Sequence, residues 1–182
     1  CAAHDLLLLI DEVQTGVGRT GSLFCFQQYG ILPDVVSFAK GIAGGLPFGG
    51  FMTNEKCRNV LGPGTHATTF GGNPVAAAGA NVVLDTLDDA FLQTVNEKGD
   101  YIRKTVESWN LSVVQSVRGM GLMVGIGVTC SHKEAVGKML DAGLLALTAG
   151  SDTVRLLPPL NISYEELDKG LAVLKTVLEG MA

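Results

Sequence analysis

The sequence predicts an α/β protein, in which part of a mostly parallel sheet layer is followed by a small α+β domain. The first half opens with five consecutive apolar residues, 6–10, which stop at an acidic pair. Such a run is typical of a strand that a parallel sheet buries on both faces. From about residue 90 the pattern changes to a long helix, a two-stranded hairpin and further short elements. We expect the two domains to span residues 1–85 and 86–182.

Composition and charge narrow the class of protein. Of the 182 residues, 47% are apolar and 17% are charged, which is typical of a folded chain with a buried core. The net charge of −5, without a Lys/Arg block, argues against nucleic acid or an anionic membrane as the main partner. Neither a transmembrane run nor a signal peptide is visible.

The four cysteines show no metal or disulfide pattern. Cys1, Cys25, Cys57 and Cys130 form no Cys-x-x-Cys pair and no zinc-type spacing with a histidine. We therefore expect a cytoplasmic location with reduced thiols that behave as small buried apolar residues, and no metal site.

The start of the chain suggests a fragment. It begins at Cys1 without a Met and soon enters a strand that needs a neighbour on each side. We expect the C-terminal part of a longer protein.

In the first half, glycine-rich loops alternate with short elements. We expect a loop at 15–21, a short helix at 22–29, strands at 34–39 and 47–53, a short helix at 54–60, and a polar loop at 62–74. A long helix should then begin at Asn73-Pro74, because Asn favours the N-cap and Pro the first helical position.

The second half contains two capping patterns. Ser131 and Ser163 each precede a Glu by three residues and should open helices, the second with a core-facing stripe of Leu167, Leu171, Leu174 and Leu178. The remaining expected elements are a helix at 90–109, a hairpin at 113–117 and 122–128, and strands at 144–147 and 153–156.

Asp11 and Lys40 are the candidate chemical groups of the first half. Each ends an expected strand, and ligands of parallel sheets bind at the carboxyl ends of the strands. Asp11 could hold a cationic ring nitrogen, serve Mg²⁺ beside Glu12 in an ATPase, or merely cap a turn. Lys40 could be a nucleophile of lowered pKa among glycines, or an ordinary surface lysine. The loop at 62–74 could bind phosphate or be an ordinary polar loop.

The phosphate loop that an ATPase needs is absent from the sequence. Three motifs instead resemble those of the class III aminotransferases, which use pyridoxal 5'-phosphate on the fold-type I scaffold: Asp11-Glu12-Val13-Gln14-Thr15-Gly16, Ser37-Phe38-Ala39-Lys40-Gly41 and Thr69-Phe70-Gly71-Gly72-Asn73-Pro74. The resemblance continues through the segments 118–123 and 154–160. Within the class, the segments 64–69 and 147–150 are most similar to acetylornithine aminotransferases.

The resemblance implies a role for each matching residue. Lys40 would be the Schiff-base lysine and the base that moves the proton. Asp11 would pair with the pyridine nitrogen, Val13 would pack on the ring, and Gln14 would bond near the ring hydroxyl. The implied roles in binding phosphate and substrate are those of Thr69 (cofactor phosphate, across a dimer interface), Thr68 (substrate) and Arg155 (substrate α-carboxylate).

The resemblance also implies a function and an assembly. We expect a homodimeric aminotransferase of arginine biosynthesis that moves the amino group of N-acetylornithine to 2-oxoglutarate. A related enzyme acting on ornithine, succinylornithine or 4-aminobutyrate, and a non-catalytic dimerisation fragment, are the alternatives. Because the family's preceding half supplies a phosphate loop and a ring-stacking aromatic residue, we expect these 182 residues alone to bind the cofactor poorly and to be inactive.

Overall fold

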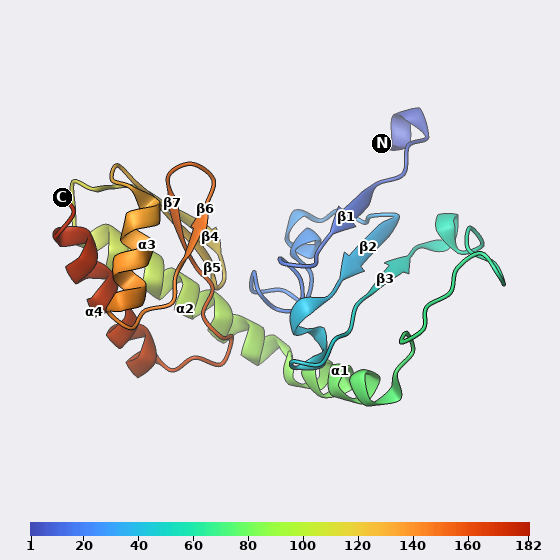
Figure 1. The fold of residues 1–182 in the computed structure, drawn as a ribbon. Helices are drawn as coiled ribbons and strands as arrows, with labels where there is room; N and C mark the ends of the chain where they lie inside the picture. Colours follow the sequence, from blue (N-terminus) through green and yellow to red (C-terminus); the bar gives the residue numbers. More distant parts are fainter. The chain divides into compact units, whose positions relative to one another are not determined.

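The fold of this chain is described by a computed structural model of residues 1–182. The chain divides into two compact units, Cys1–Leu92 and Gln93–Ala182, and each has its own sheet (Figure 1). No helix is both long and apolar enough to cross a membrane. The expected domain assignment, 1–85 and 86–182, stays a prediction.

The first unit is built on a three-stranded sheet in the order β1-β2-β3. Strands β1 and β2 run parallel, whereas β3 pairs antiparallel with β2. Helix α1 packs against η3, the short 3-10 helix that follows β2. The elements are η1 (Ala2–His4), β1 (Leu9–Asp11), η2 (Cys25–Tyr29), β2 (Val35–Phe38), η3 (Lys40–Ala43), β3 (Gly50–Thr53), η4 (Glu55–Cys57) and α1 (Pro74–Thr86).

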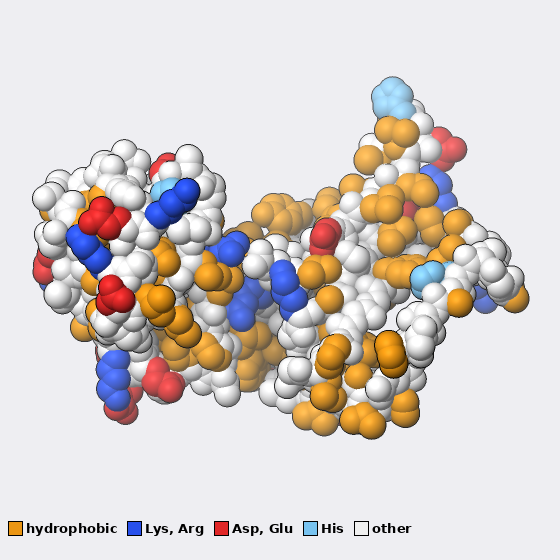
Figure 2. Space-filling view, in the orientation of Figure 1, with side chains coloured by type: hydrophobic (Ala, Val, Ile, Leu, Met, Phe, Trp, Pro, Cys, Tyr) orange, Lys and Arg blue, Asp and Glu red, His pale blue; other side chains and the backbone are white.

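Strand β1 is shorter and more exposed than expected. Only Leu9–Asp11 form the strand, and Leu6, Leu7 and Leu9 are 57%, 46% and 63% exposed. The expectation of burial on both faces was wrong for this chain, because β1 packs mainly with β2 and helix α1 packs against η3 rather than on a face of β1. Figure 2 shows hydrophobic side chains gathered over the N-terminal segment and the strands of this unit.

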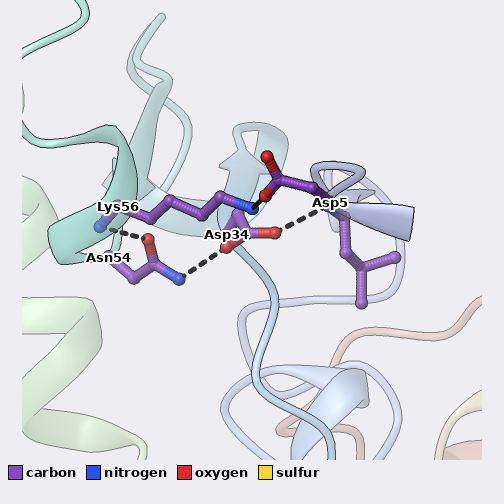
Figure 3. Close-up of polar contacts among 5 residues, drawn as sticks. Asp5, Asp34, Asn54 and Lys56 are labelled. Carbon is purple, nitrogen blue, oxygen red and sulfur yellow. Dashed lines mark hydrogen bonds and ion pairs between the residues drawn. The ribbon is translucent and has the colours of Figure 1, made fainter. Parts of the chain in front are cut away.

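A polar network joins the start of β1 and β2 to the end of β3 (Figure 3). The Asp34 carboxylate accepts hydrogen bonds from the Leu8 backbone N–H and the Asn54 side-chain amide, both at 2.8 Å. The Lys56 ammonium lies 2.9 Å from the Asp5 carboxylate. These contacts hold the pKa of Asp34 below its ordinary value, with the Leu8 hydrogen bond as the main cause.

A small core joins the loop after β1 to the helices. Val17 packs with Ile42, Ala43 and Ala80, all of which are buried. Helix α1 begins as predicted, since the Asn73 side chain accepts hydrogen bonds from the N–H groups of the first helical turn.

The second unit has a four-stranded antiparallel sheet in the order β4-β5-β7-β6. One face of this sheet is buried through residues such as Val124, Ile126 and Val154, each 0% exposed. The elements are α2 (Asp89–Ser108), whose first turn still belongs to the first unit, β4 (Val114–Met120), β5 (Met123–Val128), α3 (His132–Asp141), β6 (Leu147–Ala149), β7 (Thr153–Leu156) and α4 (Tyr164–Glu179).

Both predicted caps are present, but only one is a complete capping box. Ser163 and Glu166 bond reciprocally at the start of α4, and the predicted leucine stripe of this helix is buried. At α3 the Ser131 side chain caps the helix, while Glu134 pairs with Lys138 instead.

The four thiols are free, as predicted, but their burial differs from the prediction. Only Cys57 is buried, Cys1 is exposed, and Cys25 and Cys130 are half-buried. Residue type alone predicts burial of a free cysteine, but the segments around Cys1, Cys25 and Cys130 leave these side chains partly or fully accessible.

Candidate functional site

The carboxyl ends of β1 and β2 bring the two candidate groups to one edge of the sheet. Asp11 is the last residue of β1 and lies opposite Ser37, three residues before Lys40. Because β1 and β2 are parallel, both strands end at the same edge, where α/β sheets bind ligands. Asp11 ends its strand as predicted, whereas Lys40 lies two residues beyond the end of β2 and is the first residue of η3.

The Asp11 carboxylate is oriented through one of its oxygens. Oδ1 accepts hydrogen bonds from the Val13 backbone N–H at 2.8 Å and from the Ser37 hydroxyl at 3.3 Å. Oδ2 makes no hydrogen bond, and the side chain is exposed. An anchored carboxylate with one uncommitted oxygen suits a cationic N–H donor. Ser37 was not singled out from the sequence, although its place three residues before the lysine could have indicated it.

Lys40 adopts a strained backbone conformation at the same edge. Its φ of 53° lies in the left-handed region that glycine favours. Such outliers cost roughly 1–3 kcal/mol and cluster at functional sites. The amine is exposed and takes part in none of the ion pairs of the chain. The strained backbone therefore fixes the position of Lys40 just after β2, while its amine stays outside any ion pair with a carboxylate.

Glu12 turns away from this edge into the interior. It is 1% exposed, and its carboxylate accepts hydrogen bonds from the Thr15 hydroxyl and from the Phe26 backbone N–H. The two acids of the motif therefore do not converge, and no three His, Cys, Asp or Glu side chains are grouped as metal ligands. This arrangement disfavours the magnesium site of an ATPase. Glu12 instead anchors the loop that follows β1.

That loop is packed closely beside the site. A Cβ on Gly16 would lie 2.8 Å from the Glu12 carbonyl oxygen, so only glycine fits without a shift. Val17 has a φ of 55°, which is rare for a β-branched residue, and its side chain is buried against Ile42 and Ala43. The segment directly after Lys40 is thus held by the loop directly after Asp11. The sequence showed the glycines but gave no signal for the strained valine.

The other predicted site residues differ in their surroundings. Val13 and Gln14 are half-buried and follow Asp11 directly. Thr68 and Thr69 lie in an exposed loop between η4 and α1, where the Thr68 hydroxyl accepts a hydrogen bond from the Gly71 N–H at 3.2 Å. No hydrogen bond joins Thr69 to Asp11 or Lys40. Arg155 belongs to the second unit, where it is half-buried on β7.

Comparison with known proteins gives a family match along almost the whole chain. The family model described as "Aminotransferase class-III" matches residues 1–178. Acetylornithine aminotransferase of Haemophilus ducreyi is 46% identical over 183 residues, covering 100% of this chain and 46% of that protein. The protein of the same name from Streptococcus mutans is 43% identical, covering 98% of this chain and 48% of its own. The chain spans about half the length of these curated relatives.

Solved structures agree with the sequence comparison. The N-acetylornithine aminotransferase of Stenotrophomonas maltophilia matches with a TM-score of 0.89 and 35% identity, over 99% of this chain and 49% of that one. Ornithine delta-aminotransferase of Plasmodium falciparum matches with a TM-score of 0.90 and 32% identity, over 100% and 48%. The expected fold, a portion of the fold-type I scaffold, is confirmed.

Proposed function

Because the chain belongs to the class III aminotransferase family, we propose that the protein carrying it moves the amino group of N-acetylornithine to 2-oxoglutarate. The printed names of its relatives support this donor. The structural observation that most directly supports the proposal is that Asp11 and Lys40 lie at the same edge of the sheet.

The residues at this edge fit pyridoxal 5'-phosphate, on which the family depends. An acid with one uncommitted oxygen suits the protonated ring nitrogen, and an amine outside any ion pair suits the aldehyde. Asp11 would therefore hold the ring nitrogen, and Lys40 would hold the cofactor covalently. When bound, pyridoxal phosphate supplies an electron sink for the carbon that bears the transferred amino group.

The chain's own residues supply orientation and proton transfer. The Lys40 amine would remove a proton from the carbon that bears the amino group of the donor. When the amino group passes to the acceptor, the same amine would return a proton to the carbon that receives it. The Asp11 carboxylate would keep the ring nitrogen protonated, while Ser37 and the Val13 N–H keep the carboxylate in place. The strained backbone at Lys40 sets where the amine lies.

Further residues complete the proposed site. Val13 would pack on the ring, Gln14 would bond near the ring hydroxyl, and Thr69 would bind the cofactor phosphate of a partner subunit. Thr68 would face the substrate, and Arg155 would hold the substrate α-carboxylate. The exposed position of the loop with Thr68 and Thr69 supports contact with a second copy of the protein.

The proposal extends to the cellular role of the protein. We place it in arginine biosynthesis, in the cytoplasm, as a homodimer. The small domain would span residues 86–182. We also propose that residues 1–182 alone bind the cofactor poorly and are inactive, since they cover about half of each relative.

A second donor is favoured by one observation. The structural match to an ornithine delta-aminotransferase is as good as the match to an N-acetylornithine aminotransferase. Ornithine is therefore the main alternative donor, followed by succinylornithine and 4-aminobutyrate, and a non-catalytic dimerisation fragment is the alternative to an enzyme.

A donor screen with the full-length protein tests the proposal. With 2-oxoglutarate as acceptor, we expect glutamate to form faster from N-acetylornithine than from ornithine, succinylornithine or 4-aminobutyrate. A preference for ornithine would move the protein to the alternative. Absence of glutamate formation from any of these donors would contradict an aminotransferase of this type.

A further inference from the structure

Glu12 is a buried acid that the proposed reaction does not use. It is 1% exposed, and both oxygens of its carboxylate bond to other segments of the chain. Oε1 accepts a hydrogen bond from the Phe26 backbone N–H at 2.8 Å, and Oε2 accepts one from the Thr15 hydroxyl. A carboxylate in the interior is costly unless such donors replace the lost water. The acid and the two segments that supply its donors therefore hold one another in place.

The backbone of Glu12 joins the same point to β2. Its N–H donates to the Ser37 carbonyl at 2.9 Å, and its carbonyl accepts the Gly16 N–H, also at 2.9 Å. Ser37 lies in β2, three residues before Lys40, and Gly16 lies in the loop that follows β1. One residue thus connects the strand that leads to Lys40, the loop after β1 and the short helix η2, which contains Phe26.

One path from Glu12 leads to the end of β2, just before Lys40. Phe26, whose N–H the carboxylate binds, stacks on Phe24 with the ring centroids 5.9 Å apart. The buried Phe24 ring in turn lies against Phe38, with a centroid distance of 6.2 Å. Phe38 is the last residue of β2 and precedes Lys40 by two positions. Glu12 therefore supports the approach to the lysine through packed aromatic rings.

A second path leads to the residues just after Lys40. Thr15, whose hydroxyl binds the same carboxylate, lies two residues before Val17. Val17 is buried against Ile42 and Ala43, which belong to the short helix η3 that starts at Lys40. The segments on both sides of the lysine are therefore packed against residues that one buried acid holds.

Lys40 needs such support because its own backbone is strained. Its φ of 53° lies in the left-handed region, where a residue other than glycine stays only if its surroundings hold it. We propose that Glu12 is a positioning residue that keeps Lys40 in this conformation, and thereby keeps its amine where the proton is moved. The inference rests on the proposed function of Lys40 and adds a role for the second acid of the motif.

Steady-state kinetics of the full-length holoenzyme test this role. Glu12→Met removes both acceptor oxygens and keeps the length of the side chain. Turnover is expressed per cofactor bound to Lys40, so that molecules without cofactor do not count. We expect kcat for N-acetylornithine to fall by about tenfold or more, because small displacements of a reacting group slow proton transfer strongly. KM should stay within about threefold of the parent, since substrate binding keeps its own contacts.

Two further variants separate positioning from stability. Asp34→Leu is the matched control, because Asp34 also accepts one backbone N–H and one side-chain donor, at the opposite end of the same sheet. It should lose stability in urea and keep kcat within about twofold. In Glu12→Gln the amide oxygen can accept the Phe26 N–H, and the amide NH₂ can donate to the Thr15 hydroxyl. This conservative variant should therefore retain most of the parent kcat.

The outcomes separate the inference from the function on which it rests. A loss of kcat in Glu12→Met no larger than in Asp34→Leu would overturn the positioning role, as would a Glu12→Gln enzyme as impaired as Glu12→Met. If Glu12→Met does not fold, Thr15→Val decides, since it removes one of the two bonds and should lower kcat about threefold. Parent-like turnover in that variant would overturn the role. Failure of the proposed function is distinct, because Lys40→Ala would then turn over as the parent does.

Discussion

An aspartate and a lysine are found at each end of the first unit's sheet. At one end these side chains bind other groups of the protein, whereas at the other end they leave atoms available to a ligand. At the start of β1 and β2, Asp34 binds the Leu8 N–H and Asn54, and Lys56 binds Asp5. At the carboxyl ends, Asp11 leaves one oxygen uncommitted and Lys40 is outside every ion pair. The backbone is strained at Lys40 and not at Lys56.

This difference indicates a division of work within one sheet. The polar groups of the start end bind one another and connect the strands to the chain on either side of them. The groups of the carboxyl end are positioned by backbone and hydroxyl donors, which leaves their reactive atoms available to a ligand. Substitutions at the carboxyl end should therefore change activity, and substitutions at the start end should change stability.

The largest expected effect is that of Lys40→Ala on turnover. Loss of the amine that holds the cofactor and moves the proton should reduce kcat of the full-length protein by about 10³-fold or more. Lys56→Ala is the matched control and should retain kcat. Steady-state glutamate formation measures both. Comparable losses of kcat in the two variants would contradict the claim that only the carboxyl end of the sheet takes part in turnover.

The next effect is that of removing one carboxylate charge at each end. Asp11→Asn keeps the size of the side chain but cannot stabilise a protonated ring nitrogen, so kcat should fall by about 10²-fold. Asp34→Asn should leave kcat within about twofold of the parent. If Asp34→Asn reduced kcat as much as Asp11→Asn does, the assignment of the cofactor site to the carboxyl end of the sheet would be contradicted.

A smaller effect is expected from crowding the loop beside the site. In Gly16→Ala the new methyl group would lie 2.8 Å from the Glu12 carbonyl and 3.0 Å from the Phe24 ring. We expect a loss of about 1–3 kcal/mol in the free energy of unfolding, measured in urea. Gly62→Ala, at a position with no atom within 4 Å of the added Cβ, should change it by less than about 0.5 kcal/mol. Equal stability of both variants would contradict the close packing at Gly16.

The smallest effect is a pH dependence of the start end. The folded-state pKa of Asp34 is lowered, chiefly by the Leu8 hydrogen bond, so the ionised carboxylate stabilises the fold. This stabilisation is present above the ordinary aspartate pKa of about 4 and is lost as the pH falls through the lowered folded value. The stability difference between the parent and Asp34→Asn should therefore be largest near neutral pH and shrink in acid. A stability difference between the two proteins that grows in acid would contradict a lowered folded-state pKa for Asp34.

The sequence was most informative where structure is decided locally. Asn73, Ser131 and Ser163 cap their helices as predicted, because a side-chain oxygen needs only the N–H groups of the next turn. The leucine stripe of α4 follows from helical spacing alone. The strand end at Asp11 was also predictable from an apolar run that stops at a charged residue, whereas β2 ends at Phe38, two residues before Lys40.

The remaining features depend on contacts between distant segments. Leu6, Leu7 and Leu9 are exposed because no helix is packed over the segment that leads into β1, which periodicity cannot reveal. The left-handed conformations of Val17 and Lys40 run against residue preference and are held by packing around Ile42 and Ala43. The paths from Glu12 to the residues on either side of Lys40 require packing between the loop after β1, η2 and the end of β2.

The central claim is that the carboxyl ends of β1 and β2 form the cofactor site, with Lys40 as the residue that holds it. The direct measurement is to incubate the full-length protein with pyridoxal phosphate, reduce it with borohydride, and locate the phosphopyridoxyl group by peptide mass spectrometry. We predict one modified position, Lys40, with Lys56 unmodified. A label that is absent from Lys40, or spread equally over the surface lysines, would contradict the account.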